Sequence, residues 1–140
     1  MKKILIIEAV FYKDISAMLL EGTTKRLDES EYEYEVITIS GALEIPAVIA
    51  MAENSEKYAG YIGLGCVIRG ETSHYDYVCG ESARGLSELG FRNQLAVANG
   101  IITTENKEQA IARANINQKN KGGFVANVCL EMIELKKKFS

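Results

Sequence analysis

The sequence predicts a single-domain α/β fold in which a four-stranded parallel sheet carries helices on both faces. Three observations favour this fold class. Four short apolar runs rich in β-branched residues are typical of strands buried on both faces. Longer stretches with apolar residues at helical spacing separate these runs. The 140 residues, 47% hydrophobic and 25% charged, have the size and composition of one globular domain spanning residues 1–140.

The four strand-like runs cover residues 4–7, 36–39, 61–68 and 95–102. Helical spacing begins after the first run, where one apolar face carries Ile15, Met18, Leu19, Gly22 and Leu27. Pro46 is expected to open the second helix, because a proline in the first turn removes no hydrogen bond that the helix needs. The third helix is expected over residues 75–89 and to end before Gly90.

Thr104 is the expected N-cap of a fourth helix, with Glu105 in its first turn and Ala110, Ile111 and Ala114 facing inward. A last helix is expected over residues 123–138. The element order is then β-α-β-α-β-α-β-α-α, which is the pattern of a doubly wound parallel sheet. The predicted architecture is a flavodoxin-like three-layer sandwich.

Composition excludes several classes of function. The net charge of -3 offers no electrostatic basis for a nucleic-acid partner or for binding to an anionic membrane. Lysines 136–138 end a helical pattern, where cations complement the helix dipole. No apolar run is long enough for a signal peptide core or a membrane span. Cys66, Cys79 and Cys129 are an odd, dispersed set, which argues against a disulfide framework and a zinc site. A cytoplasmic location is therefore expected.

Motifs for cofactors and metals are incomplete. Gly63 and Gly65 begin a dinucleotide-binding pattern, but the third glycine would fall at Ile68. No lysine follows a glycine-rich loop as in a nucleotide-binding P-loop. Glu71 and His74 could share one helical face, yet a metal site needs more ligands than this pair and the chain has no second histidine. The prediction is an enzyme without cofactor or metal.

The predicted sheet brings four loops to one edge, where ligands of such sheets bind: residues 8–13, 40–45, 69–74 and 99–103. Phe11 offers an aromatic face, and residues 41–44 offer backbone amides and one carboxylate. Residues 70–74 lead into a helix, whose free N–H groups favour phosphate. His74 lies there too, and histidine is a side chain that can serve in acid–base catalysis. Each feature alone also fits an ordinary surface loop. Together they favour a phosphate-bearing, aromatic ligand and acid–base chemistry at His74.

Four segments at consistent spacing carry a resemblance to a known family: 41–46 (GALEIP), 67–78 (VIRGETSHYDYV), 100–106 (GIITTEN) and 120–122 (NKG). Along nearly its whole length, the sequence resembles 6,7-dimethyl-8-ribityllumazine synthases of riboflavin biosynthesis. The resemblance implies condensation of 5-amino-6-ribitylaminouracil with 3,4-dihydroxy-2-butanone 4-phosphate, with release of phosphate and water. It also implies that no cofactor takes part.

The resemblance further implies roles for particular residues. His74 would be the proton shuttle. The aminouracil ring and ribityl chain would contact Phe11, Ala42, Leu43, Glu44, Val67, Ile68, Asn99 and Lys121. Phosphate would be bound by the segment Glu71, Thr72 and Ser73 and by Arg113. Some positions depart from the family pattern: Val10 and Tyr12 flank Phe11, Glu71 brings a negative charge to the phosphate segment, Asn99 replaces an aromatic residue, and Phe124 replaces an acidic one.

By the same resemblance the chain is expected to form a homopentamer. Its active sites would lie between adjacent subunits, with Arg113 and Lys121 serving a neighbour's site. Some family members close twelve pentamers into an icosahedral shell of sixty subunits, and the sequence leaves that choice open. Two other functions also remain: a flavin- or lumazine-binding relative without turnover, and a structural shell or interaction module. Retention of His74 and Arg113 favours the enzyme.

Overall fold

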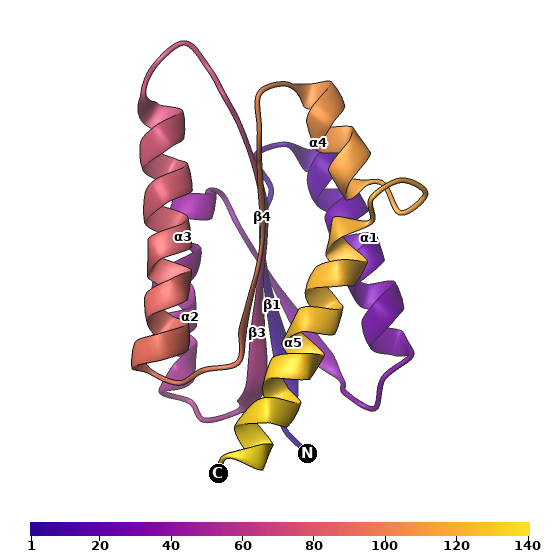
Figure 1. Cartoon of the computed structure of the whole chain (residues 1–140), viewed down its shortest axis with the longest axis vertical. Coiled ribbons are helices and arrows are strands. Elements are labelled where there is room, and N and C mark those ends of the chain that lie inside the picture. Colours follow the sequence, from indigo (N-terminus) through magenta and orange to yellow (C-terminus); the bar gives the residue numbers. More distant parts are fainter.

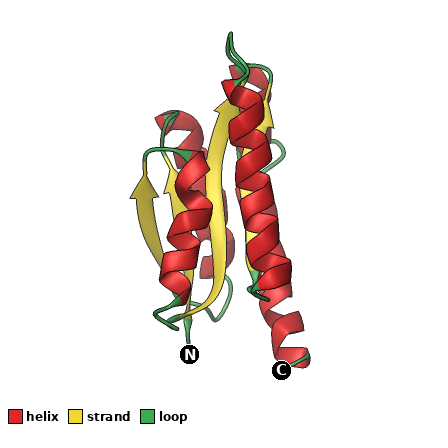
Figure 2. Cartoon of the chain, turned by 90° about the vertical axis from the view of Figure 1, so that its left-hand side faces the viewer, coloured by secondary structure: helices red, strands yellow, loops and turns green.

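A computed structural model describes residues 1–140 and confirms the predicted fold class and element order. The chain forms a three-layer flavodoxin-like sandwich around four parallel strands (Figures 1 and 2). The elements are β1 (Lys3–Ala9), α1 (Lys13–Asp28), β2 (Tyr34–Ile39), the 3-10 turn η1 (Ala42–Glu44), α2 (Ile45–Glu53), β3 (Tyr58–Ile68), α3 (His74–Arg92), β4 (Val97–Thr104), α4 (Lys107–Ala114) and α5 (Lys121–Lys138). No helix combines the length and apolar character that spanning a membrane requires.

The strands lie in the order β2-β1-β3-β4, and every neighbouring pair is parallel. Helices α2 and α3 cover one face, and α1, α4 and α5 cover the other (Figure 1). Because all four strands run the same way, their carboxyl ends and the loops that follow them lie at one edge of the sheet. That edge is where the candidate site forms.

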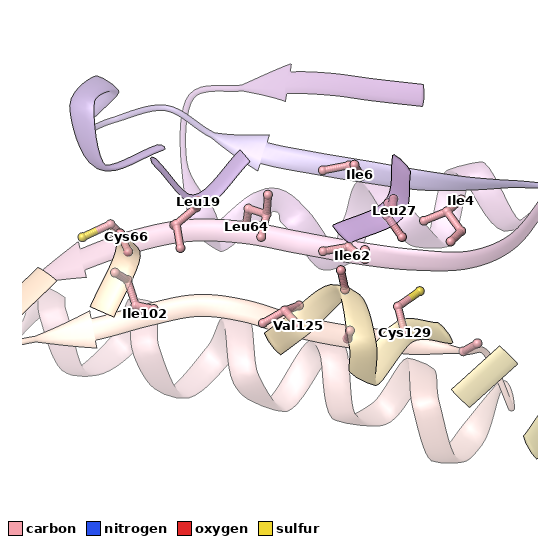
Figure 3. Packing of buried hydrophobic residues seen from close by; sticks show 14 of the residues in the cluster. Ile4, Ile6, Leu19, Leu27, Ile62, Leu64, Cys66, Ile102, Val125 and Cys129 are labelled. Carbon is pink, nitrogen blue, oxygen red and sulfur yellow. The ribbon is translucent and has the colours of Figure 1, made fainter. Parts of the chain in front are cut away.

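Alternating side chains of the central strands feed two separate cores. Ile4 and Ile6 of β1 join a cluster of 18 buried residues beneath α1 and α5 (Figure 3). Leu5 and Ile7, between them in sequence, join a cluster of 11 residues beneath α2 and α3. All four side chains are fully buried. The continuous apolar run 4–7 thus has the two-sided burial that it predicted.

Strand β2 departs from the same prediction. Val36 and Ile37 are 39% and 36% exposed, although the apolar run 36–39 predicts burial on both faces. The prediction of two-sided burial is wrong for this strand in the single chain. Strand β2 is an edge strand that pairs only with β1. An apolar pattern indicates that a strand favours burial, but it does not specify which chain covers it.

Several helix boundaries differ from those expected. The assignment of Thr104 as an N-cap is wrong: Thr104 ends β4, and its hydroxyl donates a hydrogen bond of 3.0 Å to the Asn106 carbonyl. Asn106 is the cap of α4, and its side chain accepts a hydrogen bond of 2.9 Å from the Gln109 N–H. Both residue types suit a cap, and the extra two residues of β4 decide between them. Pro46 lies in the first turn of α2, as predicted.

Helix α3 continues through Gly90 to Arg92, so the expected stop before Gly90 is also wrong. Gly90 has negative φ, and a glycine can lie inside a helix when the residues beyond it continue the pattern. Helix α5 begins two residues earlier than expected, behind Asn120, whose side chain accepts a hydrogen bond of 3.2 Å from the Gly123 N–H.

Glycines in β3 set the distance between the sheet and its helices. A β-carbon at Gly63 would lie 2.9 Å from a methyl carbon of Ile45 in α2. On the other face, a β-carbon at Gly60 would lie 2.8 Å from the Cys129 sulfur and 2.9 Å from a methyl carbon of Ile133 in α5. These separations are too short for real side-chain contacts, so both helices approach the strand where it lacks side chains.

Candidate active site

A cleft of about 740 Å³ opens at the carboxyl edge of the sheet. The loops that follow β1, β2 and β3 contribute to it, together with the first turns of η1 and α3. Its lining is Phe11, Tyr12, Ile39, Ser40, Gly41, Ala42, Leu43, Glu44, Cys66, Val67, Ile68, Gly70, Thr72, His74, Tyr75 and Val78. Eight of the residues expected at the site are in this set: Phe11, Ala42, Leu43, Glu44, Val67, Ile68, Thr72 and His74.

An apolar wall lies beside the rim of the cleft. Phe11 is 76% exposed, and its ring meets the Tyr12 ring edge-on with centroids 4.9 Å apart. Leu43 is 41% exposed in η1 beside Glu44. An apolar side chain exposed to this extent stabilises the isolated chain little, whereas a flat ligand could cover it. The wall therefore suits a ring, with the polar atoms of residues 40–44 beside it.

The segment 70–73 joins β3 to α3 and presents unpaired backbone donors. None of its four N–H groups forms a hydrogen bond within the chain. His74 is the first residue of α3, and its own N–H donates to the Thr72 hydroxyl oxygen at 3.3 Å. The His74 side chain is exposed at the cleft. Free N–H groups before a helix attract anions, and here they adjoin an imidazole.

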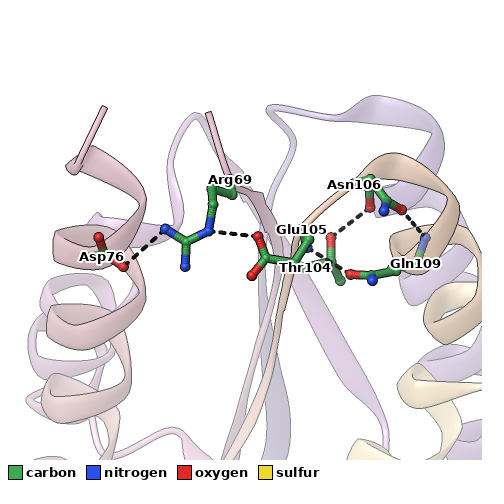
Figure 4. A network of polar contacts seen from close by, with 6 residues as sticks. All are labelled: Arg69, Asp76, Thr104, Glu105, Asn106 and Gln109. Carbon is green, nitrogen blue, oxygen red and sulfur yellow. Dashed lines mark hydrogen bonds and ion pairs between the residues drawn. The ribbon is translucent and has the colours of Figure 1, made fainter. Parts of the chain in front are cut away.

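Arg69 lies at the centre of a polar network beside this segment (Figure 4). Its Nε donates to Glu105 Oε2 at 2.7 Å, and its Nη1 lies 3.6 Å from Asp76 Oδ1. Its guanidinium also lies over the Tyr75 ring, 4.3 Å from the ring centroid. The hydrogen bond to Glu105 raises the pKa of the guanidinium above its ordinary value, so Arg69 stays charged.

The network continues into α4. The Glu105 N–H donates to the Gln109 side-chain oxygen at 2.8 Å, and the Gln109 N–H donates to the Asn106 side-chain oxygen at 2.9 Å (Figure 4). The second bond satisfies a donor in the first turn of α4 that the helix itself leaves free, and the first bond ties the residue before the cap to the same turn. As a result, the turn between β4 and α4 is joined to the first turn of α3 through Arg69.

Five expected site residues do not line the cleft of their own chain, and three of them, Asn99, Arg113 and Lys121, lie outside the loops that form it. The predicted loop over residues 99–103 is wrong, because Asn99 lies inside β4 opposite Gly63 and its side chain accepts a hydrogen bond of 2.9 Å from the Ile101 N–H. Arg113, on α4, donates from Nη1 to the Gln109 carbonyl at 3.0 Å. The Lys121 ammonium lies 4.7 Å from the Phe124 ring centroid. Helices α4 and α5 lie across the sheet from α3 (Figure 1).

Glu71 and Ser73 belong to the segment 70–73 but do not line the cleft. Both are exposed. The other lining residues had no individual role assigned. Tyr12, Ser40, Gly41 and Gly70 lie in the loops that were predicted to meet at this edge, whereas Ile39, Cys66, Tyr75 and Val78 lie in the adjoining β2, β3 and α3. For this second group, the only signal was a position beside the predicted loops.

Cys66 is a buried thiol that lines the cleft, in agreement with the buried strand predicted over residues 61–68. Burial raises the pKa of Cys66 to about 11, so the thiol is protonated and a poor nucleophile at neutral pH. No group of three or more histidine, cysteine, aspartate or glutamate side chains is arranged as a metal site. The His74 imidazole, which can both donate and accept a proton, is the cleft side chain best suited to proton transfer.

The fold and the cleft define the class: a flavodoxin-like α/β protein with a small-molecule site at the carboxyl edge of its sheet. Residues 1–137 match the family model of 6,7-dimethyl-8-ribityllumazine synthase. The chain therefore belongs to the 6,7-dimethyl-8-ribityllumazine synthase family. Members are transferase-type condensing enzymes of riboflavin biosynthesis, so the chain is an enzyme that condenses its substrates.

Individual relatives agree along the whole chain. A protein of this name from Bartonella tribocorum is 53% identical over 137 residues, which cover 97% of this chain and 91% of the relative. The protein of the same name from Agrobacterium fabrum is 51% identical, covering 96% of this chain and 95% of its own. That from Novosphingobium aromaticivorans is 49% identical over 140 residues, and each chain is covered completely.

Proposed function

We propose that this chain condenses 5-amino-6-ribitylaminouracil with 3,4-dihydroxy-2-butanone 4-phosphate to form 6,7-dimethyl-8-ribityllumazine, with release of phosphate and water. The proposal rests on one observation above the others: four unpaired N–H groups lie directly before His74, in a segment whose Gly70 and Thr72 line a cleft that also has an apolar wall. That combination suits a phosphate leaving group, a flat ring and proton transfer between them.

The phosphate is bound by the backbone N–H groups of residues 70–73, which point to no other partner within the chain. The hydroxyls of Thr72 and Ser73 add donors. Glu71 is exposed, so its carboxylate can turn toward water and need not face the phosphate. Arg113 of an adjacent subunit supplies the balancing cation, and its planar fork suits two phosphate oxygens.

The aminouracil ring stacks on Phe11, with Val67 and Ile68 on its other side. Ala42, Leu43 and Glu44 hold the ribityl chain, for which the polar atoms of η1 and its preceding loop are well suited. Lys121 and Asn99 approach from the adjacent subunit. Tyr12 and Phe124 make the contacts at the ring less polar than the residues usual in the family would.

His74 moves protons between the reacting groups. The amine of the uracil attacks the ketone, phosphate leaves, and the second nitrogen closes the new ring. Each of these steps adds or removes a proton at nitrogen, carbon or oxygen, and the exposed imidazole beside the phosphate segment can donate or accept it. General acid–base help of this kind is typically worth about 10²–10⁴-fold, and holding two substrates together contributes at least as much.

The chain forms a homopentamer with active sites between adjacent subunits. Support comes from Asn99, Arg113 and Lys121, which are expected at the site but do not line the cleft of their own chain. The exposed apolar residues of β2 provide further surface for contact with another copy. Assembly of pentamers into a shell is not needed for this site.

The central experiment follows lumazine fluorescence and phosphate release together, after subtraction of the slow reaction without protein. Wild type is expected to accelerate both signals. His74→Asn should lose about 10²–10⁴-fold in kcat and recover part of it with added imidazole. Arg113→Ala should chiefly raise the KM for the ketone phosphate, whereas the exposed Arg92→Ala should match wild type. A wild-type rate equal to that of the reaction without protein would refute the enzymatic function. If such a protein still bound lumazine or riboflavin, it would be a binding protein.

A subunit-mixing experiment tests the shared site. At a ketone phosphate concentration well below the raised KM of Arg113→Ala, the His74→Asn and Arg113→Ala chains should each be nearly inactive alone. A mixed pentamer, however, contains sites that combine an intact His74 with an intact Arg113 from its neighbour. Random mixing of equal amounts should restore about a quarter of the sites. Native mass spectrometry should show five subunits. No recovery in proven mixed pentamers would mean that each site is built from one chain.

A further inference from the structure

Arg69 has no role in the proposed reaction, yet it is the most connected polar side chain beside the cleft. Its backbone N–H donates to the Thr104 carbonyl at 2.9 Å, which fixes this residue to the end of β4. The chain then leaves the sheet for the segment 70–73, whose N–H groups have no partner within the chain. Arg69 is thus the last residue tied to the sheet before the proposed phosphate segment.

The Arg69 side chain spans that segment and contacts its far end. Its Nη1 lies 3.6 Å from Asp76 in the first turn of α3, and its guanidinium lies over the Tyr75 ring at 4.3 Å. The third contact is the 2.7 Å hydrogen bond to Glu105 in the β4–α4 turn. One side chain therefore joins the start of α3 to the end of β4, on either side of the segment.

These contacts also argue against a direct role in anion binding. Two carboxylates, Asp76 and Glu105, balance the single positive charge of Arg69. Glu105 accepts a hydrogen bond from Nε, Asp76 forms an ion pair with Nη1, and the Tyr75 ring covers one face of the guanidinium. A phosphate at these two nitrogens would compete with the carboxylates already there. Arg69 does not line the cleft, whereas Gly70 and Thr72 after it do.

We propose that Arg69 is a positioning residue, which holds the backbone donors of residues 70–73 and the start of α3 in the orientation that receives the phosphate of the ketone substrate. The inference rests on the proposed function. A segment without internal hydrogen bonds samples many conformations, and fixing both ends lowers the entropy lost when the phosphate binds. The arginine improves phosphate binding without touching it.

The test compares Arg69→Ala and Arg69→Lys with Arg84→Ala. Arg84 is a matched control because it also binds two carboxylates, Glu81 and Glu88, each at 2.7 Å. All three residues lie on the outer surface of α3, the helix that carries Asp76. Arg69→Ala is expected to weaken inorganic phosphate binding and raise the KM for the ketone phosphate by about tenfold, the equivalent of one charge-assisted hydrogen bond. The KM for the aminouracil should stay within about twofold. Lysine keeps the charge without the fork, so Arg69→Lys should lose less phosphate affinity than Arg69→Ala but more than the Arg84→Ala control.

Glu105→Gln separates positioning from direct binding by the sign of its effect. If Arg69 positions the segment, removing its closest partner loosens the segment and weakens phosphate binding. The double variant Arg69→Ala with Glu105→Gln should then be no worse than Arg69→Ala alone. If instead Glu105→Gln strengthens phosphate binding, a freed guanidinium contacts the phosphate directly and the proposal is overturned.

Failure of this inference is distinguishable from failure of the proposed function. A wild-type protein that neither binds phosphate nor accelerates the condensation rejects the function itself. A wild-type protein that does both, beside an Arg69→Ala variant with unchanged phosphate affinity, rejects only the role of Arg69. Equal increases in both KM values would also overturn it, because they would indicate general loss of structure. Should the alanine variant fail to fold, Arg69→Lys and Glu105→Gln still decide the question.

Discussion

Gly122 of α5 lies directly against the Leu19 carbonyl of α1, so closely that a β-carbon at position 122 would collide with that oxygen. Thr23 completes the contact, since its buried hydroxyl reaches the Leu19 carbonyl at 2.9 Å and the Gly122 carbonyl at 3.0 Å. The obstacle at Gly122 is backbone, which cannot rotate away as a side chain can. Helices α1 and α5 therefore touch through their backbones at this point.

Gly122→Ala should destabilise the protein by about 3 kcal/mol, because an added methyl group forces the two helices apart. Gly80→Ala is the matched control: Gly80 lies inside α3 with nothing within 4 Å of an added β-carbon. There alanine should stabilise the fold by up to about 1 kcal/mol through its better helix propensity. Urea unfolding of both variants measures the difference, and a stable Gly122→Ala protein would contradict the packing described.

Asn120 caps α5 with its side chain while its backbone is left-handed, at φ 46° and ψ 55°. Asn120→Ala loses the cap and also loses the short polar side chain through which asparagine tolerates left-handed backbone, at a total cost of about 2 kcal/mol. Asn120→Gly loses the same hydrogen bond but relieves the backbone, so it should cost only a few tenths of that. Thermal unfolding should rank wild type first, glycine second and alanine last. An alanine variant as stable as glycine would exclude a left-handed Asn120.

Phe11 should matter for substrate binding but not for folding, given its high exposure in the free chain. Phe11→Leu should raise the KM for the aminouracil about tenfold, in line with the loss of one stacked ring, and change stability by less than about 0.5 kcal/mol. Phe11→Tyr keeps the ring and should remain near wild type. Phe139→Leu, an equally exposed control on the other side of the molecule, should alter neither quantity. Unchanged kinetics in Phe11→Leu would rule out stacking.

Stability should fall as the pH rises above about 9. Burial raises the pKa of Cys129 from 9.0 to about 12, so the folded protein keeps a proton that the unfolded chain releases. Fewer protons are then bound in the unfolded state, and the free energy of unfolding decreases with pH by up to about 1.4 kcal/mol per unit for this thiol. The loss begins at the unfolded value and ends near pH 12.

Urea unfolding at several pH values from 8 to about 10.5 measures this slope. Cys129→Ala should be less stable at pH 8, because it leaves a small cavity, but its stability should fall less steeply with pH. Cys79→Ala is the control, since Cys79 is only partly buried and its removal should leave most of the slope in place. Identical slopes in wild type and Cys129→Ala would mean that the buried thiol does not control the effect.

The sequence predicted the order of the elements because each apolar run has the period of its own local structure. Element boundaries were harder to predict where two neighbouring residues both suit the same structural position. Thr104 and Asn106 both suit a helix cap, and only the length of β4, fixed by pairing with β3, decides for Asn106. The exposed face of β2 could not be foreseen either, because an apolar strand looks the same in sequence whether a helix or another chain covers it.

The candidate site likewise contains residues that could be predicted from the sequence and residues that could not. The cleft residues on the loops after β1, β2 and β3 were predictable, since parallel strands bring those loops to one edge. Arg69 was not singled out, because its role depends on Asp76 and Glu105, and the latter lies 36 positions away along the chain. Arg113 and Lys121 were named only through family resemblance, whereas Asn99 was also expected at this edge from the predicted loop over residues 99–103. Their positions outside the cleft have no signal in the strand and helix periods.

The close approach of α2 and α5 to the glycines of β3 has a consequence for how related sequences can diverge. Where a relative carries alanine in place of Gly63, its counterpart of Ile45 should be smaller, and alanine in place of Gly60 should accompany smaller residues at positions 129 or 133. We expect the summed side-chain volume at each contact between β3 and a helix to be maintained, rather than the identity of any single residue. Substitutions at these positions should therefore appear as correlated pairs during evolution, and grafting one member of a pair without the other should weaken the fold.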